Sequence, residues 1–357
     1  MVIGVDPHKQ THTAVAVSEV GEALSERTVK AREEGLFELV RWARSLAEER
    51  TFALEDGRHV TGRLERFLLA RGERVVRVAP KLMAERRRSA RTRGKSDPVD
   101  ATAVARAALR EHDLPEARLA GEDLEIRLLL DHREDIVREN NRDICRLRWH
   151  LHDLDPELEP PARGFRSERA IERLQRRLDR RERTVQVQIA RELCRQVRAR
   201  LRRERALARE IEDRVRRHAP ELLALPGCGA LTAAKLVGEI AGVARFSSEG
   251  KLAMHAGIAP LDASSGRQQR HRLNRTGNRQ LNCAVHRMAV TQARHHAPAR
   301  ELLARKQAEG KGKREALRSL KRQLIRVIYR TLSAQQIKER DPIRIDAGVP
   351  IGTPCLT

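Results

Sequence analysis

Aromatic rings, paired cysteines and long apolar runs are all scarce in this chain of 357 residues. Aromatic residues make up only 2% of it, so few rings are present on which nucleic-acid bases could stack. The five cysteines, Cys145, Cys194, Cys228, Cys283 and Cys355, form no C-x-x-C pair, which argues against both a zinc site and a disulfide framework. We therefore expect reduced thiols that take no part in the chemistry.

Apolar stretches in the sequence are much shorter than the roughly 20 residues that a membrane-spanning helix needs. The opening MVIGVDPHK has no long apolar core of the kind found in signal peptides. These absences predict a cytoplasmic protein with no membrane partner. With 40% hydrophobic and 34% charged residues, the chain has enough apolar material for two or three ordered domains.

Basic residues are present in excess. Lysine and arginine number 73 against 50 for aspartate and glutamate, which gives a formal net charge of +23. Such a surplus favours a polyanionic partner, and nucleic acid is the most economical one. A basic, solvated surface without a binding role is the alternative.

Residues 1–115 follow the pattern of a mixed α/β domain. Apolar or alternating runs predict strands over Val2–Val5, His12–Val20, Ala23–Ala31, Thr51–Leu54 and Arg74–Ala79. Helical spacing predicts helices over Glu34–Glu49, from about His59 to Ala70, and from Pro80. Three strands followed by alternating helices and strands is the element order of the ribonuclease H-like (RuvC-like) fold. In that fold the first and fourth strands lie side by side at the centre of the sheet.

Four acidic residues at the ends of these elements, here termed the acidic cluster, are Asp6, Glu55, Asp97 and Asp100. Asp6 and Glu55 end the first and fourth strands and can therefore meet. Asp97 and Asp100 stand three apart in a predicted helix, Asp97–Leu109, so they share one helical face. Packed carboxylates repel one another, and a divalent metal, Mg²⁺ or Mn²⁺, is the usual means of keeping them ionised. Alternatively, each Asp-Pro pair simply starts a helix or ends a strand.

Residues 122–217 are dominated by arginine and contain almost no glycine. Leucine and isoleucine recur at heptad-like spacing, which predicts long helices interrupted near residues 156–164. Between Arg163 and Arg217 there are 20 arginines, 9 acidic residues and no lysine. Helices of this kind commonly form coiled-coil arms that dimerise, and surplus arginines can bind phosphates through two hydrogen bonds. A solvated helical spacer is the alternative.

The segment 222–241 reads LLALPGCGALTAAKLVGEIA and places a glycine turn between two apolar helices. In helix-hairpin-helix modules such a turn brings backbone N–H groups to a phosphate, which the next helix N-terminus also attracts. Gly227, Gly229 and Lys235 are therefore candidate nucleic-acid contacts. A tight turn required by packing alone explains the pattern equally well.

A Ser-Ser-Gly sequence, in which Ser264 and Ser265 precede glycine, is followed by a strongly basic run. Such a serine is exposed, and it could attack a phosphate held by the basic residues that follow, Arg267, Arg270, Arg272 and Arg275. For this motif alone, a flexible turn is the alternative. Residues 218–335 would form the mainly helical domain that carries the motif, and residues 341–357 have the character of a loose tail.

These motifs occur along the chain in the order GVDPHK, ALED, KSDPVDA, LPGCGALTAAKLVGEI, FSSEGKLAMHAGIAP, SSG and RLNRTGNRQLN. In that order they resemble the IS110-family transposases, which pair an N-terminal RuvC-like DEDD domain with a C-terminal transposase domain. The resemblance places the acidic cluster at the four metal-binding positions and Ser265 at the nucleophile position. Ser264 is the alternative nucleophile because it is adjacent. Asn274 and Asn282 stand where basic residues are typical of the family.

The resemblance implies a recombinase of a bacterial insertion sequence, associated with the nucleoid when active. Its serine would attack a DNA phosphodiester and hold the strand as a phosphoserine, with Mg²⁺ neutralising the phosphate, and strands would exchange through a junction. A structured bridge RNA would specify target and donor DNA. The resemblance also implies a homo-oligomer, a dimer or tetramer, in which the acids of one protomer complete a site with the serine of another.

Two other classes of function remain open from the sequence. A RuvC-like nuclease would use the acidic cluster with a water nucleophile and would tolerate the loss of Ser265. An inactive nucleic-acid-binding remnant would tolerate Asp6→Asn as well.

Overall fold

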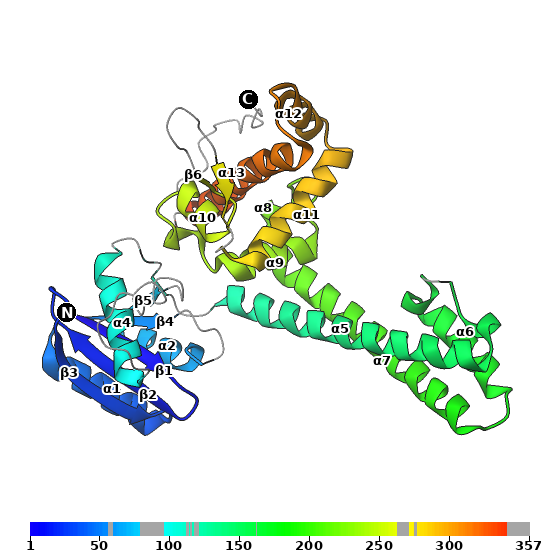
Figure 1. Ribbon diagram of the computed structural model, residues 1–357, viewed down its shortest axis with the longest axis horizontal. Coiled ribbons are helices and arrows are strands. Elements are labelled where there is room, and N and C mark those ends of the chain that lie inside the picture. Colours follow the sequence, from blue (N-terminus) through cyan, green and yellow to red (C-terminus); the bar gives the residue numbers. More distant parts are fainter. Residues whose placement is uncertain are drawn as a thin grey trace. The chain divides into compact units, whose positions relative to one another are not determined.

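A computed structural model of the chain describes residues 1–55, 60–78, 96–111, 114, 116–117, 121–161, 163–262, 271–274 and 277–340. These residues form two compact units, whose elements are labelled in Figure 1. The first unit comprises residues 1–121 with residues 244–251. The second comprises residues 122–243 and the described residues from 252 onward. The division of the second unit into a helical region and a separate C-terminal domain stays a prediction.

The first unit is built on a five-stranded sheet in the order β3-β2-β1-β4-β5. The strands are β1 (Val2–Pro7), β2 (Thr11–Val17), β3 (Ala23–Lys30), β4 (Thr51–Glu55) and β5 (Arg74–Val78). β2 runs antiparallel to both β1 and β3, whereas β4 runs parallel to both β1 and β5. This topology confirms the predicted mixed α/β unit and is compatible with a ribonuclease H-like domain.

Three described helices accompany the sheet: α1 (Glu33–Leu46), α2 (Gly62–Leu69) and α4 (Asp97–Arg110). The predicted order of the described elements is confirmed, but several predicted extents differ, two of them by three residues at the end of the element. The second strand ends at Val17 instead of Val20, because Ser18 begins a turn in which Gly21 has a φ of 82°. The first helix ends at Leu46, three residues before the predicted end. The predicted helix from Pro80 lies outside the described residues.

Helix α4 lies directly on β1 because Gly4 has no side chain. A Cβ atom at Gly4 would be 2.1 Å from the carbonyl oxygen of Ala101 and 2.5 Å from the backbone nitrogen of Ala105. Both alanines are fully buried, so moving the helix away from the strand would leave a void between them. This close packing brings the first turn of α4 to the end of β1.

In the second unit, two long helices run antiparallel: α5 (Glu122–Leu154) and α7 (Val185–His218). Their direction follows from ion pairs that join the start of α5 to the end of α7, Glu122 to Arg214, and the middle of both helices, Arg133 to Glu204. The chain between them holds two 3₁₀ turns (Pro156–Leu158 and Gly164–Arg166) and α6 (Glu168–Asp179). The long helices and the break between them are therefore confirmed.

The remaining elements of the second unit are mostly helical. They are α8 (Pro220–Leu223), α9 (Ala230–Ile240), a 3₁₀ turn (Val243–Arg245), α10 (Glu249–His255), β6 (Pro260–Asp262), β7 (His271–Leu273), α11 (Arg279–His295), α12 (Ala297–Ala308) and α13 (Lys313–Arg340). The 3₁₀ turn and α10 extend into residues 244–251, which are grouped with the first unit. Helix α9 packs on α5, α7 and α11, and α11 packs on α12 and α13. Among the described residues, no helix combines the length and apolarity that crossing a membrane requires.

Candidate active site

Two strand ends bring Asp6 and Glu55 together. Asp6 lies opposite Thr13 of β2 and is only 8% exposed. Val5 and Leu54 are paired across the parallel strands β1 and β4, so Asp6 and Glu55 are the next residues along this ladder. Residues at the same height on two paired strands project to the same face of a sheet. The backbone positions of Asp6 and Glu55 are therefore neighbours at one end of the sheet.

The start of α4 supplies the other carboxylates of the acidic cluster. Asp100 is buried, with 5% of its surface exposed, whereas the side chain of Asp97 is 51% exposed. The imidazole Nε2 of His8 lies 3.2 Å from Oδ2 of Asp6 and 3.3 Å from Oδ1 of Asp97. The structure thus gathers Asp6, Asp97 and His8 at one point.

The electrostatics of the acidic cluster favour a cation. Burial raises the pKa of Asp6, His8 lowers it, and the negative charges of Asp100 and Asp97 raise it further. The backbone N–H groups at the N-terminus of α4 offset part of the charge on Asp97 and Asp100. Carboxylate oxygens with an imidazole nitrogen beside them are a donor set that divalent metals accept, so the residues present fit such an ion.

Two short strands bound the segment that contains the predicted nucleophile. Strands β6 and β7 pair antiparallel, with Asp262 opposite His271. Residues 263–270, here termed the serine segment, lie in the sequence between these two paired residues. Arg272 lies on β7 and is exposed. Five predicted site residues lie outside the described part of the chain: Ser264, Ser265, Arg267, Arg270 and Arg275.

A partly buried polar network holds the chain on both sides of these strands. Asn278 accepts hydrogen bonds from the first backbone N–H groups of α11, and its Nδ2 donates to Glu239 Oε2 at 2.5 Å. Asn282 donates to the carbonyl oxygens of residues 256 and 257, at 2.9 and 3.1 Å. Lys321 of α13 donates to Asn282 Oδ1 at 2.5 Å. The residues after β7 are thereby fixed to those before β6.

The glycine turn before α9 meets packing demands in this structure. Gly227 has a φ of 77°, and a Cβ atom there would lie 3.2 Å from Cβ of Thr291. Lys235 is 6% exposed, and its Nζ lies 2.9 Å from Oε1 of Glu134 on α5. Because that ion pair uses the charge of Lys235 inside the unit, packing is the better interpretation for this lysine. Gly229 has open space beside its Cα and stays a candidate contact.

The described cysteines are free thiols, two of them deeply buried. Burial raises the pKa of Cys194 and of Cys228 to about 12. Both thiols are therefore protonated at neutral pH and are poor nucleophiles.

Three residues in these arrangements were not identified from the sequence: His8, Glu239 and Lys321. An Asp-x-His sequence at the end of a strand is a usable signal for His8, because alternate residues of an extended chain share a face. Glu239 and Lys321 carry no local signal, because each bonds to a residue 39 positions away in the chain.

Two family models match the chain over its N-terminal and C-terminal parts. Residues 3–156 match a model of the DEDD transposase domain of IS110 elements. Residues 219–304 match a model described as the transposase IS116/IS110/IS902 family. The acids at the strand ends and the chain around β6 and β7 lie within these two matches.

Proteins of bacterial insertion elements are similar along nearly the whole chain. A 44.8 kDa protein of insertion element IS116 from Streptomyces clavuligerus is 29% identical, over 94% of this chain and 95% of its own length. A 42 kDa protein of IS900 from Mycobacterium paratuberculosis is 28% identical, over 92% and 94%. A protein of IS110 from Streptomyces coelicolor is 33% identical over 41% of this chain and 36% of its own length. With both domain models matched in order, this chain belongs to the IS110 family of transposases.

Proposed function

We propose that this transposase cuts and joins DNA strands through Ser265, with a divalent metal held by the acidic cluster. The observation that carries the proposal is the convergence of Asp6, Asp97 and Asp100 at the end of β1. A set of carboxylates packed this closely needs a cation, and the family generally uses divalent metal at this domain. Mg²⁺ is the proposed ion, with Mn²⁺ as its substitute.

The chemistry is a transesterification. The hydroxyl oxygen of Ser265 would form a bond to a DNA phosphorus, the phosphorus–oxygen bond of the strand would break, and the proton of the serine would be released. Bound metal would supply positive charge for the phosphate and for the leaving oxygen. Arginines after the serine would hold the phosphate with two hydrogen bonds each, and Arg272 is exposed for such a contact. Attack by the freed strand end on the phosphoserine would join the new strands through a junction.

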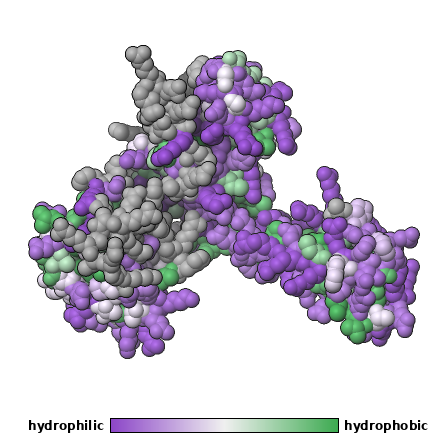
Figure 2. Space-filling model, in the orientation of Figure 1, coloured by the Kyte–Doolittle hydropathy of each residue, from purple (hydrophilic) through white to green (hydrophobic). Residues whose placement is uncertain are grey.

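The long helices of the second unit are the proposed binding surface for the nucleic acids. On the face seen in Figure 2, the surface over α5, α6 and α7 is mostly hydrophilic. The surplus arginines can bind the phosphates of DNA and of RNA. We propose a structured bridge RNA as the guide that specifies the target and donor DNA. The same long helices are the proposed contacts of a dimer or tetramer.

A water-using nuclease is the second candidate, because the acidic cluster by itself could promote attack by water. The two candidates separate in a recombination assay with purified protein, guide RNA, element-end DNA and Mg²⁺. We expect Ser265→Ala to abolish strand joining and leave DNA and RNA binding almost intact, and Asp6→Asn to abolish joining too. If Ser264→Ala is inactive instead, the nucleophile is one residue earlier.

Other outcomes would overturn the proposal. Cleavage that survives both serine substitutions and disappears in Asp6→Asn would identify the water-using nuclease. Unchanged nucleic-acid binding, with no cleavage in the wild type or in any variant, would identify an inactive remnant.

A further inference from the structure

His8 lies beside the acidic cluster but is not one of its four residues. Its Nε2 lies 3.2 Å from an oxygen of Asp6 and 3.3 Å from an oxygen of Asp97. One ligand-capable atom from each of these three residues lies within 4.8 Å of the other two. A single ring nitrogen therefore faces two carboxylates that come from different elements, β1 and α4.

These spacings match those of atoms bound to one ion. Ligands at about 2.1 Å from an octahedral cation lie about 3.0 Å apart when they are adjacent around it. The two nitrogen–oxygen separations at His8 exceed that value by only a few tenths of an ångström. A cation bound to Nε2 of His8 would therefore also lie within reach of an oxygen of Asp6 and of Asp97.

The backbone holds His8 in this position. β1 ends at Pro7, and the His8 N–H donates to the carbonyl oxygen of Thr11 at 2.8 Å, which closes the turn into β2. Asp6 and His8 are alternate residues of an extended segment and so face the same side. The side chain of His8 is 52% exposed, which leaves the outer side of the site open to a phosphate or to water.

We propose that His8 is a nitrogen ligand of the metal site, which makes the site a mixed imidazole and carboxylate centre. The inference rests on the proposed metal-binding function of the acidic cluster and adds a ligand to it. Imidazole binds Mn²⁺, Co²⁺ and Zn²⁺ more readily than Mg²⁺, which prefers oxygen. This chain should therefore favour transition metals over Mg²⁺ more strongly than a site made of four carboxylates would.

The test is Mn²⁺ binding to the full-length protein, followed by electron paramagnetic resonance. We expect the wild type to show magnetic coupling between bound Mn²⁺ and a ¹⁴N nucleus. His8→Ala should lose this coupling and bind Mn²⁺ at least about tenfold more weakly, with a smaller loss for Mg²⁺. His152→Ala, which removes an exposed imidazole on α5, is the matched control and should behave as wild type.

The wild-type spectrum tests the inference even if a variant folds poorly. A site that binds Mn²⁺ without nitrogen coupling, and that loses Mn²⁺ in Asp6→Asn but not in His8→Ala, would overturn the role of His8 and leave the acidic cluster as a metal site. No Mn²⁺ binding to the wild type would overturn the proposed metal site itself, and the role of His8 with it.

Discussion

Asp6 is the residue at which burial and neighbouring charge act most directly on the site. Burial raises its pKa, His8 lowers it, and the charges of Asp100 and Asp97 raise it. With the pKa raised in the folded state, the ionised carboxylate is less favourable there than in the unfolded chain. The proposed metal-binding role of Asp6 and the stability of the fold are therefore opposed at this position.

For the metal-free protein at pH 7, we expect Asp6→Asn to raise the melting temperature. The penalty of ionised Asp6 is complete above its raised pKa and absent below its ordinary value of 3.8, so the advantage of the asparagine should shrink as the pH falls. Thermal unfolding with a chelator at pH 7 and at a pH below 3.8 measures the effect. A variant that melts below the wild type at pH 7 would contradict it.

Single residues differ in how well the sequence reveals them. Asp6 and Asp97 could be identified because each stands at the end of an element with a clear apolar pattern. Lys235 was misleading, because a lysine on an apolar helix gives no sign that a partner helix supplies Glu134 to bury its charge. Side chains whose role depends on tertiary neighbours carry no signal of their own.

At the scale of elements, the packing of α4 on β1 decides whether the acidic cluster assembles. We expect Gly4→Ala to cost about 1–3 kcal/mol or more, because the added Cβ atom would overlap the backbone of α4. Divalent-metal binding should weaken as well, since α4 must move away with Asp97 and Asp100. Chemical denaturation and a metal titration measure the two effects.

The matched control for Gly4 is Gly121→Ala. No atom lies within 4 Å of a Cβ built at Gly121, so the same chemical change should alter neither property there. Unchanged stability and metal binding in Gly4→Ala would show that the close packing is not what positions the cluster.

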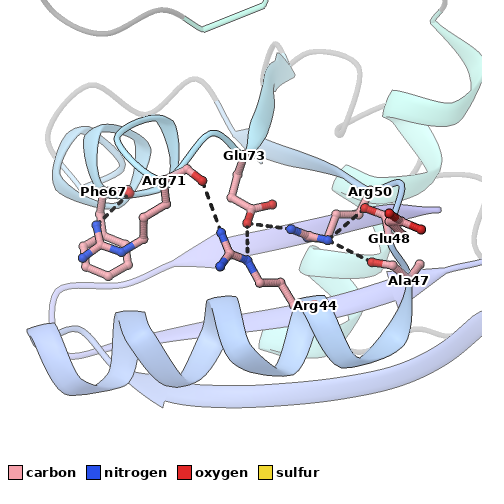
Figure 3. A network of polar contacts seen from close by, with 7 residues as sticks. All are labelled: Arg44, Ala47, Glu48, Arg50, Phe67, Arg71 and Glu73. Carbon is pink, nitrogen blue, oxygen red and sulfur yellow. Dashed lines mark hydrogen bonds and ion pairs between the residues drawn. The ribbon is translucent and has the colours of Figure 1, made fainter.

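A buried carboxylate, that of Glu73, joins three segments of the first unit, as Figure 3 shows. The side chain of Glu73 is 2% exposed and accepts hydrogen bonds from Arg44 at 3.0 Å and Arg50 at 2.7 Å. Arg44 also donates to the carbonyl oxygen of Arg71, whose guanidinium stacks on Phe67. Helix α1, the start of β4 and the start of β5 are thereby tied together.

We expect Glu73→Gln to lower the free energy of unfolding by about 3–5 kcal/mol, because it leaves the largely buried Arg50 without its counter-charge. Asp135→Asn is the control. It removes one partner of an exposed pair with Arg138 and should cost no more than about 1 kcal/mol. Equal losses in the two variants, measured by urea denaturation, would contradict the buried role.

The order of strands and helices could be predicted because it follows from local periodicity. The five strands and their connections agree with the predicted order. The close approach at Gly4 and the bonds from Lys321 could not be predicted, because they arise only where distant segments pack. Local periodicity therefore reveals the identity of the elements but not the contacts between them.

At the scale of the whole molecule, the net charge of +23 favours binding to nucleic acid. Arg195 and Arg203 on α7 are exposed and take part in no ion pair within the described residues. We expect their replacement by alanine to weaken DNA and RNA binding at every sequence tested. On duplex DNA, the slope of log affinity against log salt should fall by up to about 0.9 for each phosphate that the variant no longer neutralises.

Arg216→Ala is the control for these arginines. Its guanidinium is already paired with Glu212 and is therefore less available to a phosphate. We expect its removal to change the salt slope less than the removal of Arg195 or Arg203. Binding titrations at several salt concentrations measure all three variants. An identical salt slope for wild type, Arg195→Ala and Arg203→Ala would show that α7 is not part of the binding surface.

Composition and motif order predicted the family and DNA as a partner. The proposed chemistry rests on the serine segment, which lies outside the described residues. The most direct measurement is therefore covalent trapping. Protein, element-end RNA and end-containing DNA are incubated with Mg²⁺ and denatured, and peptides are searched by mass spectrometry for attached nucleotide. The account predicts an adduct at Ser265 that is absent from Asp6→Asn. Cleaved DNA without any serine adduct would contradict it.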